Sequence, residues 1–200
     1  YEELYNKIKS KQTDKDDKLI ILYTSDKQAQ HSYIQNAKNK GYEVLLLDSP
    51  IVSHLIQKLE TSKENIQFAR VDSDHIDNLI NKDKNKISKL NDDQKKELEE
   101  IVKNIINDDK FVIKLESMDS KENPFLITNP EFMRRMKEMQ QSGGGGMFGT
   151  GNMPEMFNLV INTNSDLISQ IVNTKTKKKQ ERLINHCLLY TSDAADDVEC

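Results

Sequence analysis

Three short β-favouring apolar runs alternate with two helical patterns in the first half of the chain, and this order limits what it can fold into. Each run is too short for a buried helix, and turn residues separate it from its neighbours. Such alternation needs right-handed crossovers, so it predicts a small parallel three-stranded α/β unit ending near Ile80. The predicted strands are residues 18–23, 43–47 and 66–71, and the predicted helices are residues 27–40, ended by Gly41, and 52–59.

The second half of the chain has a mixed pattern. Residues 81–91 are rich in Lys, Asp and Asn, which bury too little surface to order firmly, so they predict a linker. An α+β unit is expected over residues 92–186, with Asp92 or Asp93 capping its first helix. Its predicted helices are residues 92–106, 131–141 and 166–172 with a further start at 180–184, and its predicted strands are residues 111–115 and 157–161.

Composition and charge exclude several classes of function. The chain has 200 residues, 36% hydrophobic and 31% charged, which is enough apolar material for two modest cores. Its net charge of -4 gives no basic bias towards nucleic acid, and no apolar run approaches the roughly 20 residues that span a bilayer. We therefore predict a cytosolic protein with neither a nucleic-acid nor a membrane partner.

Metal, disulfide and catalytic signals are weak. Cys187 and Cys200 form no CxxC pair, and the four histidines show no ligand spacing, so no metal site or disulfide framework is predicted. Residues 144–149 match G-x-G-x-x-G, but a phosphate-binding loop of that kind follows a strand and precedes a helix, whereas here a helix precedes it. A flexible loop is the better interpretation. The lysines at 175 and 177–179 are interpreted as a solvated linker, and no catalytic residue is predicted.

Methionines gather in one stretch, and six of the seven lie between Met133 and Met156. In the predicted helix over residues 131–141, Phe132, Met136 and Met139 share one face and Met133 adjoins it. This helix is either an ordinary core helix or a partly exposed binding element, because thioether side chains adapt to irregular partners. The neighbouring glycine loop favours a binding element, with the predicted binding residues Phe132, Met133, Met136, Met139, Met147 and Phe148.

Several of these segments, taken in order, resemble the ninety-kilodalton heat-shock chaperones in their bacterial form. The similarity is collinear over roughly residues 1–186 and does not depend on a single motif. It covers the distal middle domain first and then the C-terminal domain. The segments that carry it are Leu19-Ile20-Ile21-Leu22-Tyr23, the stretch from Lys38 to Leu47, Phe68-Ala69-Arg70-Val71-Asp72-Ser73-Asp74, Asn129-Pro130-Glu131-Phe132-Met133-Arg134-Arg135-Met136, the stretch from Pro154 to Asn162, and Arg182-Leu183-Ile184-Asn185.

The resemblance implies an ATP-dependent chaperone that binds non-native client proteins and forms a homodimer. ATP and Mg²⁺ would be bound by a domain outside this segment, so the segment itself is expected to be non-enzymatic and to hold no cofactor. Residues 1–80 would be the distal middle domain and residues 92–186 an incomplete C-terminal domain. The helix over residues 132–139 maps onto the family's client-binding helix. Residues 187–200 depart from the family and resemble translated adapter sequence, so a non-native tail is expected there.

Two other functions remain open at this stage. One is a structural module whose Met-rich helix docks a single fixed partner. The other is an enzyme that uses the carboxyl edge of the parallel sheet, which would need a phosphate loop or paired catalytic groups after Tyr23 or Leu47. Ser25 and Asp48-Ser49-Pro50 stand there instead, and they are typical of turns.

Overall fold

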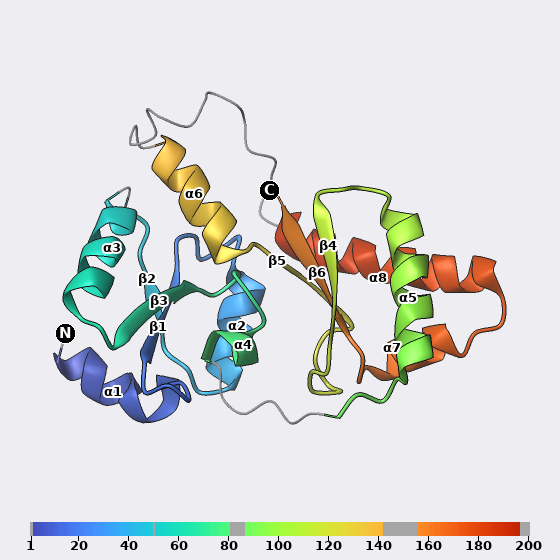
Figure 1. The fold of residues 1–200 in the computed structure, drawn as a ribbon, viewed down its shortest axis with the longest axis horizontal. Coiled ribbons are helices and arrows are strands. Elements are labelled where there is room, and N and C mark those ends of the chain that lie inside the picture. Colours follow the sequence, from blue (N-terminus) through green and yellow to red (C-terminus); the bar gives the residue numbers. More distant parts are fainter. Residues whose placement is uncertain (1, 50, 81–86, 142–155, 197–200) are drawn as a thin grey trace. The chain divides into compact units, whose positions relative to one another are not determined.

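The computed structural model describes residues 2–49, 51–80, 87–141 and 156–196, and its contacts divide the chain into two compact units (Figure 1). Unit 1 contains the described residues of Tyr1–Lys84 and Asn129–Met153. Unit 2 contains those of Asn85–Thr128 and Pro154–Cys200. The chain therefore passes from unit 1 to unit 2, returns to unit 1 for one helix, and then completes unit 2.

Unit 1 is a three-stranded parallel sheet with helices. The strand order is β2-β1-β3, and Tyr23 of the central strand stands in register with Leu45 on one side and Arg70 on the other. The elements are α1 (Glu2–Gln12), β1 (Leu19–Thr24), α2 (His31–Asn39), β2 (Val44–Leu46), α3 (Val52–Ser62), β3 (Ile66–Arg70), α4 (Ile76–Ile80) and α6 (Glu131–Gln141).

Burial of β1 on both faces organises this unit. All six of its residues are buried, and alternate side chains point to opposite faces of the sheet. Ile20 and Leu22 join a core cluster with residues of α2 and α4, and Ile21 and Tyr23 join another with residues of α1 and α3. The predicted three-stranded parallel sheet is confirmed. Gly41 also ends α2 as predicted, with a φ of 77° that a side chain rarely adopts.

Unit 2 is an α+β structure around a mixed sheet. The strand order is β4-β6-β5, in which β6 runs parallel to β4 and antiparallel to β5. Leu159 and Ile161 of the central strand are fully buried and share one core with residues of the three helices. The elements are α5 (Asp92–Ile106), β4 (Phe111–Glu116), β5 (Phe125–Thr128), β6 (Phe157–Asn162), α7 (Asp166–Val172) and α8 (Lys177–Asp196).

Buried asparagines close one end of the unit 2 sheet. Asn162 donates from its amide to the Asp119 carbonyl at 2.7 Å and accepts from the Met118 backbone N–H at 3.2 Å. Asn164 donates to the Met118 carbonyl at 3.1 Å and accepts from the Lys89 N–H at 2.8 Å. These bonds satisfy backbone groups that burial would otherwise leave unpaired.

The start of unit 2 and its strand β5 differ in detail from the sequence predictions. Asn91, not Asp92 or Asp93, caps α5, through a capping box with Gln94. Strand β5 was not predicted, because four residues give too short a pattern. Residues 81–86 of the predicted linker lie outside the described part, while Leu90 is buried in the unit 2 core.

Helix α8 is longer than the sequence pattern indicated. Its first turn contains Lys177, which the sequence placed in a solvated linker, and the helix continues to Asp196, well into the predicted non-native tail. Cys187 is buried in the core, and burial raises the pKa of its thiol. This buried side chain gives the helix a packing face that the adapter-like sequence did not reveal. Within the described residues, no helix has the length and apolar character needed to cross a membrane.

We expect the unit 2 core to respond strongly to cavity formation. Ile161→Ala should lower the free energy of unfolding by about 2–5 kcal/mol, because Ile161 is 0% exposed. Ile87→Ala is the matched control, since Ile87 is 90% exposed and its loss should change stability by less than about 0.5 kcal/mol. Urea unfolding followed by circular dichroism measures both, and equal effects would contradict this core.

Candidate functional site

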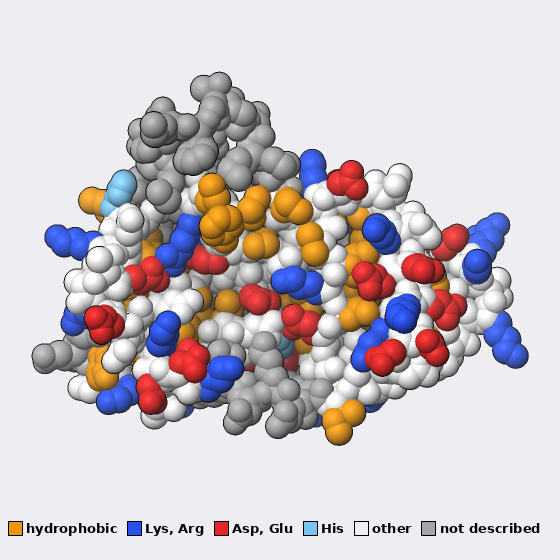
Figure 2. Space-filling model, viewed as in Figure 1, with side chains coloured by type: hydrophobic (Ala, Val, Ile, Leu, Met, Phe, Trp, Pro, Cys, Tyr) orange, Lys and Arg blue, Asp and Glu red, His pale blue; other side chains and the backbone are white. Residues whose placement is uncertain are grey.

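Helix α6 exposes an aromatic side chain next to its methionines. Phe132 is 71% exposed and Met136 is 36% exposed, one helical turn apart on the same face, while Met133 beside them is partly buried. Figure 2 shows hydrophobic side chains at the surface around the lower end of α6 as it is drawn in Figure 1. Leaving this apolar area in water forgoes roughly 25 cal/mol per Å², so it is a candidate contact surface.

A different side of α6 carries charged residues that bind it to unit 1. Arg134 is only 7% exposed, and its guanidinium donates to the Tyr23 hydroxyl at 2.6 Å. The guanidinium carbon also lies 5.7 Å from the centre of the Tyr23 ring, within cation–π range, and Arg134 pairs with Glu131 on its own helix. Tyr23 belongs to the central strand β1, so this contact joins α6 to the core.

Arg135 makes the second attachment. Its two terminal nitrogens donate to the two carboxylate oxygens of Glu60 on α3, at 2.8 and 3.1 Å. One of them also donates to the Phe68 carbonyl on β3 at 3.0 Å, and the Nε donates to Glu131 at 2.7 Å. The hydrogen bond to Glu60 is the main cause that raises the pKa of Arg135 above its ordinary value.

The backbone adds two further ties. Glu60 accepts from the Phe68 N–H at 2.7 Å, so the carboxylate that binds Arg135 is itself held by β3. The Asn129 N–H donates to the Asp72 carbonyl at 2.8 Å, just ahead of α6. Hydrogen bonds that involve a charged group contribute about 1.5–3 kcal/mol each, and breaking one partner of a buried pair costs more. These hydrogen bonds and ion pairs are the contacts that attach α6 to the rest of unit 1.

The structure brings together only part of the predicted binding set. Phe132 and Met136 share the exposed face and Met133 adjoins it; Met139 is in α6, but its side chain is outside the described part. Met147 and Phe148 also lie outside the described residues. Sequence reasoning did not identify Arg134 and Arg135 as residues that attach the helix. Glu60 and Tyr23 are 75 and 111 residues away from them, a distance no local pattern bridges.

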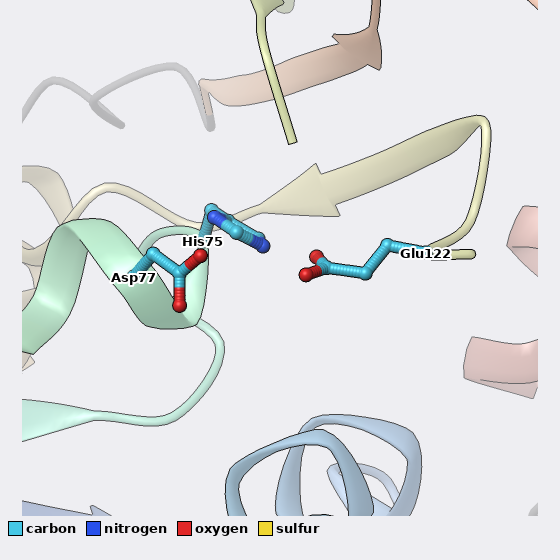
Figure 3. Close-up of side chains that lie close together, drawn as sticks. All are labelled: His75, Asp77 and Glu122. Carbon is cyan, nitrogen blue, oxygen red and sulfur yellow. The ribbon is translucent and has the colours of Figure 1, made fainter. Parts of the chain in front are cut away.

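His75 and Asp77 are a second group of titratable side chains in unit 1, at the start of α4 (Figure 3). His75 is buried, at 4% exposure, and Asp77 forms an ion pair with Lys40 at 2.6 Å. Glu122, also drawn in Figure 3, belongs to unit 2. A histidine beside an aspartate that already has a cationic partner does not define a metal site within unit 1.

Comparison with known proteins gives the family. No family model matches the chain. Chaperone protein HtpG of Bacteroides fragilis is 39% identical over 181 residues, which are 89% of this chain and 26% of that protein. The Bacteroides thetaiotaomicron protein of the same name is 40% identical over 86% of the chain, and that of Porphyromonas gingivalis is 36% identical over 92%.

These relatives are chaperone proteins, and the similarity extends along nearly the whole chain. The chain belongs to the HtpG family, as the sequence resemblance indicated. It spans about a quarter of the length of the relatives it matches, 26% in the first case.

The exposure of Phe132 can be tested directly, because the chain contains no tryptophan. We expect Phe132→Trp to give emission close to that of the same variant in urea, with similar quenching by iodide, since position 132 is 71% exposed. Phe157→Trp is the control, because Phe157 is partly buried against Phe111 at a ring distance of 5.8 Å. A blue-shifted, protected emission at position 132 would show that the α6 face is covered.

Proposed function

We propose that this chain is a client-handling segment of an ATP-dependent chaperone, and that the apolar face of α6 contacts non-native proteins. One observation carries the proposal: Phe132, 71% exposed, and Met136 lie on one face of a helix whose attachment uses other residues. The named function of the HtpG relatives supports it. Flexible thioether and aromatic side chains at an exposed surface suit partners of irregular shape.

ATP enters this proposal only through the longer protein. ATP and Mg²⁺ binding, homodimer assembly and a cytosolic location are proposed from the family, whose members are about four times as long as the matched segment. The segment is proposed to contribute client contact without hydrolysing ATP. The glycine-rich residues 144–149 lie outside the described part of the chain. In sequence they follow a helix and not the strand that a phosphate-binding loop of this kind requires.

The proposal is tested by thermal aggregation of two unrelated model proteins in the presence of the chain, with and without ATP. We expect suppression of both, unchanged by ATP, because a general apolar surface recognises unfolded segments and not one sequence. Suppression of neither protein, with tight binding to one fixed partner, would instead support a docking module.

Replacing the apolar face should weaken this suppression. We expect the double variant Phe132→Ser and Met136→Ser to need at least about threefold more protein for half-maximal suppression, a loss of about 0.65 kcal/mol of binding or more. The matched control is Ile87→Ser with Leu189→Ser, which removes two other exposed apolar side chains, 90% and 61% exposed. Circular dichroism checks that each variant keeps its fold. Equal losses in both double variants would contradict a role specific to α6.

A further inference from the structure

Helix α6 is attached through one side, which carries two consecutive arginines, and exposes its apolar residues on another side. At about 100° per residue, Glu131, Arg134 and Arg135 gather on one side of the helix. Phe132 and Met136 gather roughly 125° away from that side. The helix can therefore be held by one side while the other stays in water, and the two sets of residues do not compete.

The attachment depends on polar contacts more than on apolar packing. Among the described residues, no apolar side chain of α6 belongs to the core clusters of unit 1. Arg134 reaches the Tyr23 hydroxyl, and Arg135 reaches Glu60 and the Phe68 carbonyl. A guanidinium has a planar set of donors that matches a carboxylate with two bonds, which fixes direction as well as position.

The path of the chain allows α6 to leave unit 1 independently of both sheets. Helix α6 groups with unit 1, whereas β5 before it and β6 after it belong to the sheet of unit 2. Neither sheet would have to unfold for α6 to leave unit 1. A helix held in this way detaches at a free-energy cost set by its own contacts, not by the stability of the core.

We propose that Arg134 and Arg135 are positioning residues, which hold α6 on the α/β unit through Tyr23 and Glu60 and thereby fix the direction in which Phe132 and Met136 face the client. This inference rests on the proposed function and deepens it, because it gives the client surface a defined place on unit 1. The contacts are made by the arginines, and the client is bound by their apolar neighbours.

Hydrogen exchange of the whole chain tests the attachment without any client. We expect Arg135→Gln to raise exchange of the α6 amides at least about tenfold, while the β1 amides keep their protection. Arg135→Lys keeps the charge but loses the two-bond geometry. Its α6 exchange rate should lie between those of Arg135→Gln and the parent protein. Arg182→Gln, at an exposed arginine of α8, is the matched control and should leave the exchange of both the α6 and the β1 amides unchanged.

The same four proteins are then compared for suppression of aggregation. Arg135→Gln should need at least about threefold more protein than the parent, with Arg135→Lys intermediate. Unchanged α6 exchange in Arg135→Gln, or an equal rise in β1, would overturn the positioning role. Suppression absent from the parent would overturn the proposed function, while the exchange measurement would still decide whether the arginines hold α6.

Discussion

Complete burial of strand β1 is the constraint on which unit 1 depends. Because both faces of this strand are apolar, both must be covered by helices, and the parallel order of the sheet follows from the crossovers that place them. The strand also buries the Tyr23 hydroxyl, which needs a partner. Arg134 donates to it, so the requirement of a buried side chain on β1 is met by a residue 111 positions later.

That contact explains why α6 lies with unit 1. A surface helix normally turns its apolar stripe inward and its charges outward. On α6 the inward side holds two arginines and a glutamate. Both arginines pair with Glu131, and Arg135 also pairs with Glu60 and donates to a backbone carbonyl. The apolar stripe then has no place in the core and stays in water, which is costly for an isolated protein and useful for one that binds other chains.

The sequence predicts the local elements of this structure better than their grouping. The runs that become β1, β2 and β3 are recognisable because they are short, apolar and separated by turns, and Gly41 marks a helix end through its own backbone preference. Helical spacing also placed Phe132 and Met136 on one face of this helix, but spacing alone left open whether that face is buried or exposed.

What could not be predicted depends on residues far apart in the chain. The pattern grouped α6 with the second unit, since the helix lies between two strands of that unit in sequence. Its contacts with Glu60 and Tyr23 place it with the first, and such pairing leaves no local signal. The domain boundaries remain predictions, and so does the client-binding role of all six residues: Phe132, Met133, Met136, Met139, Met147 and Phe148.

Methyl NMR of the methionines can observe the apolar face of α6 while a client protein binds. We predict that an unfolded model protein broadens or shifts the Met136 methyl signal and leaves that of Met118 unchanged, because Met118 is 4% exposed in unit 2. An unperturbed Met136 signal during client binding, or equal changes at Met118, would contradict the claim that α6 is the client surface.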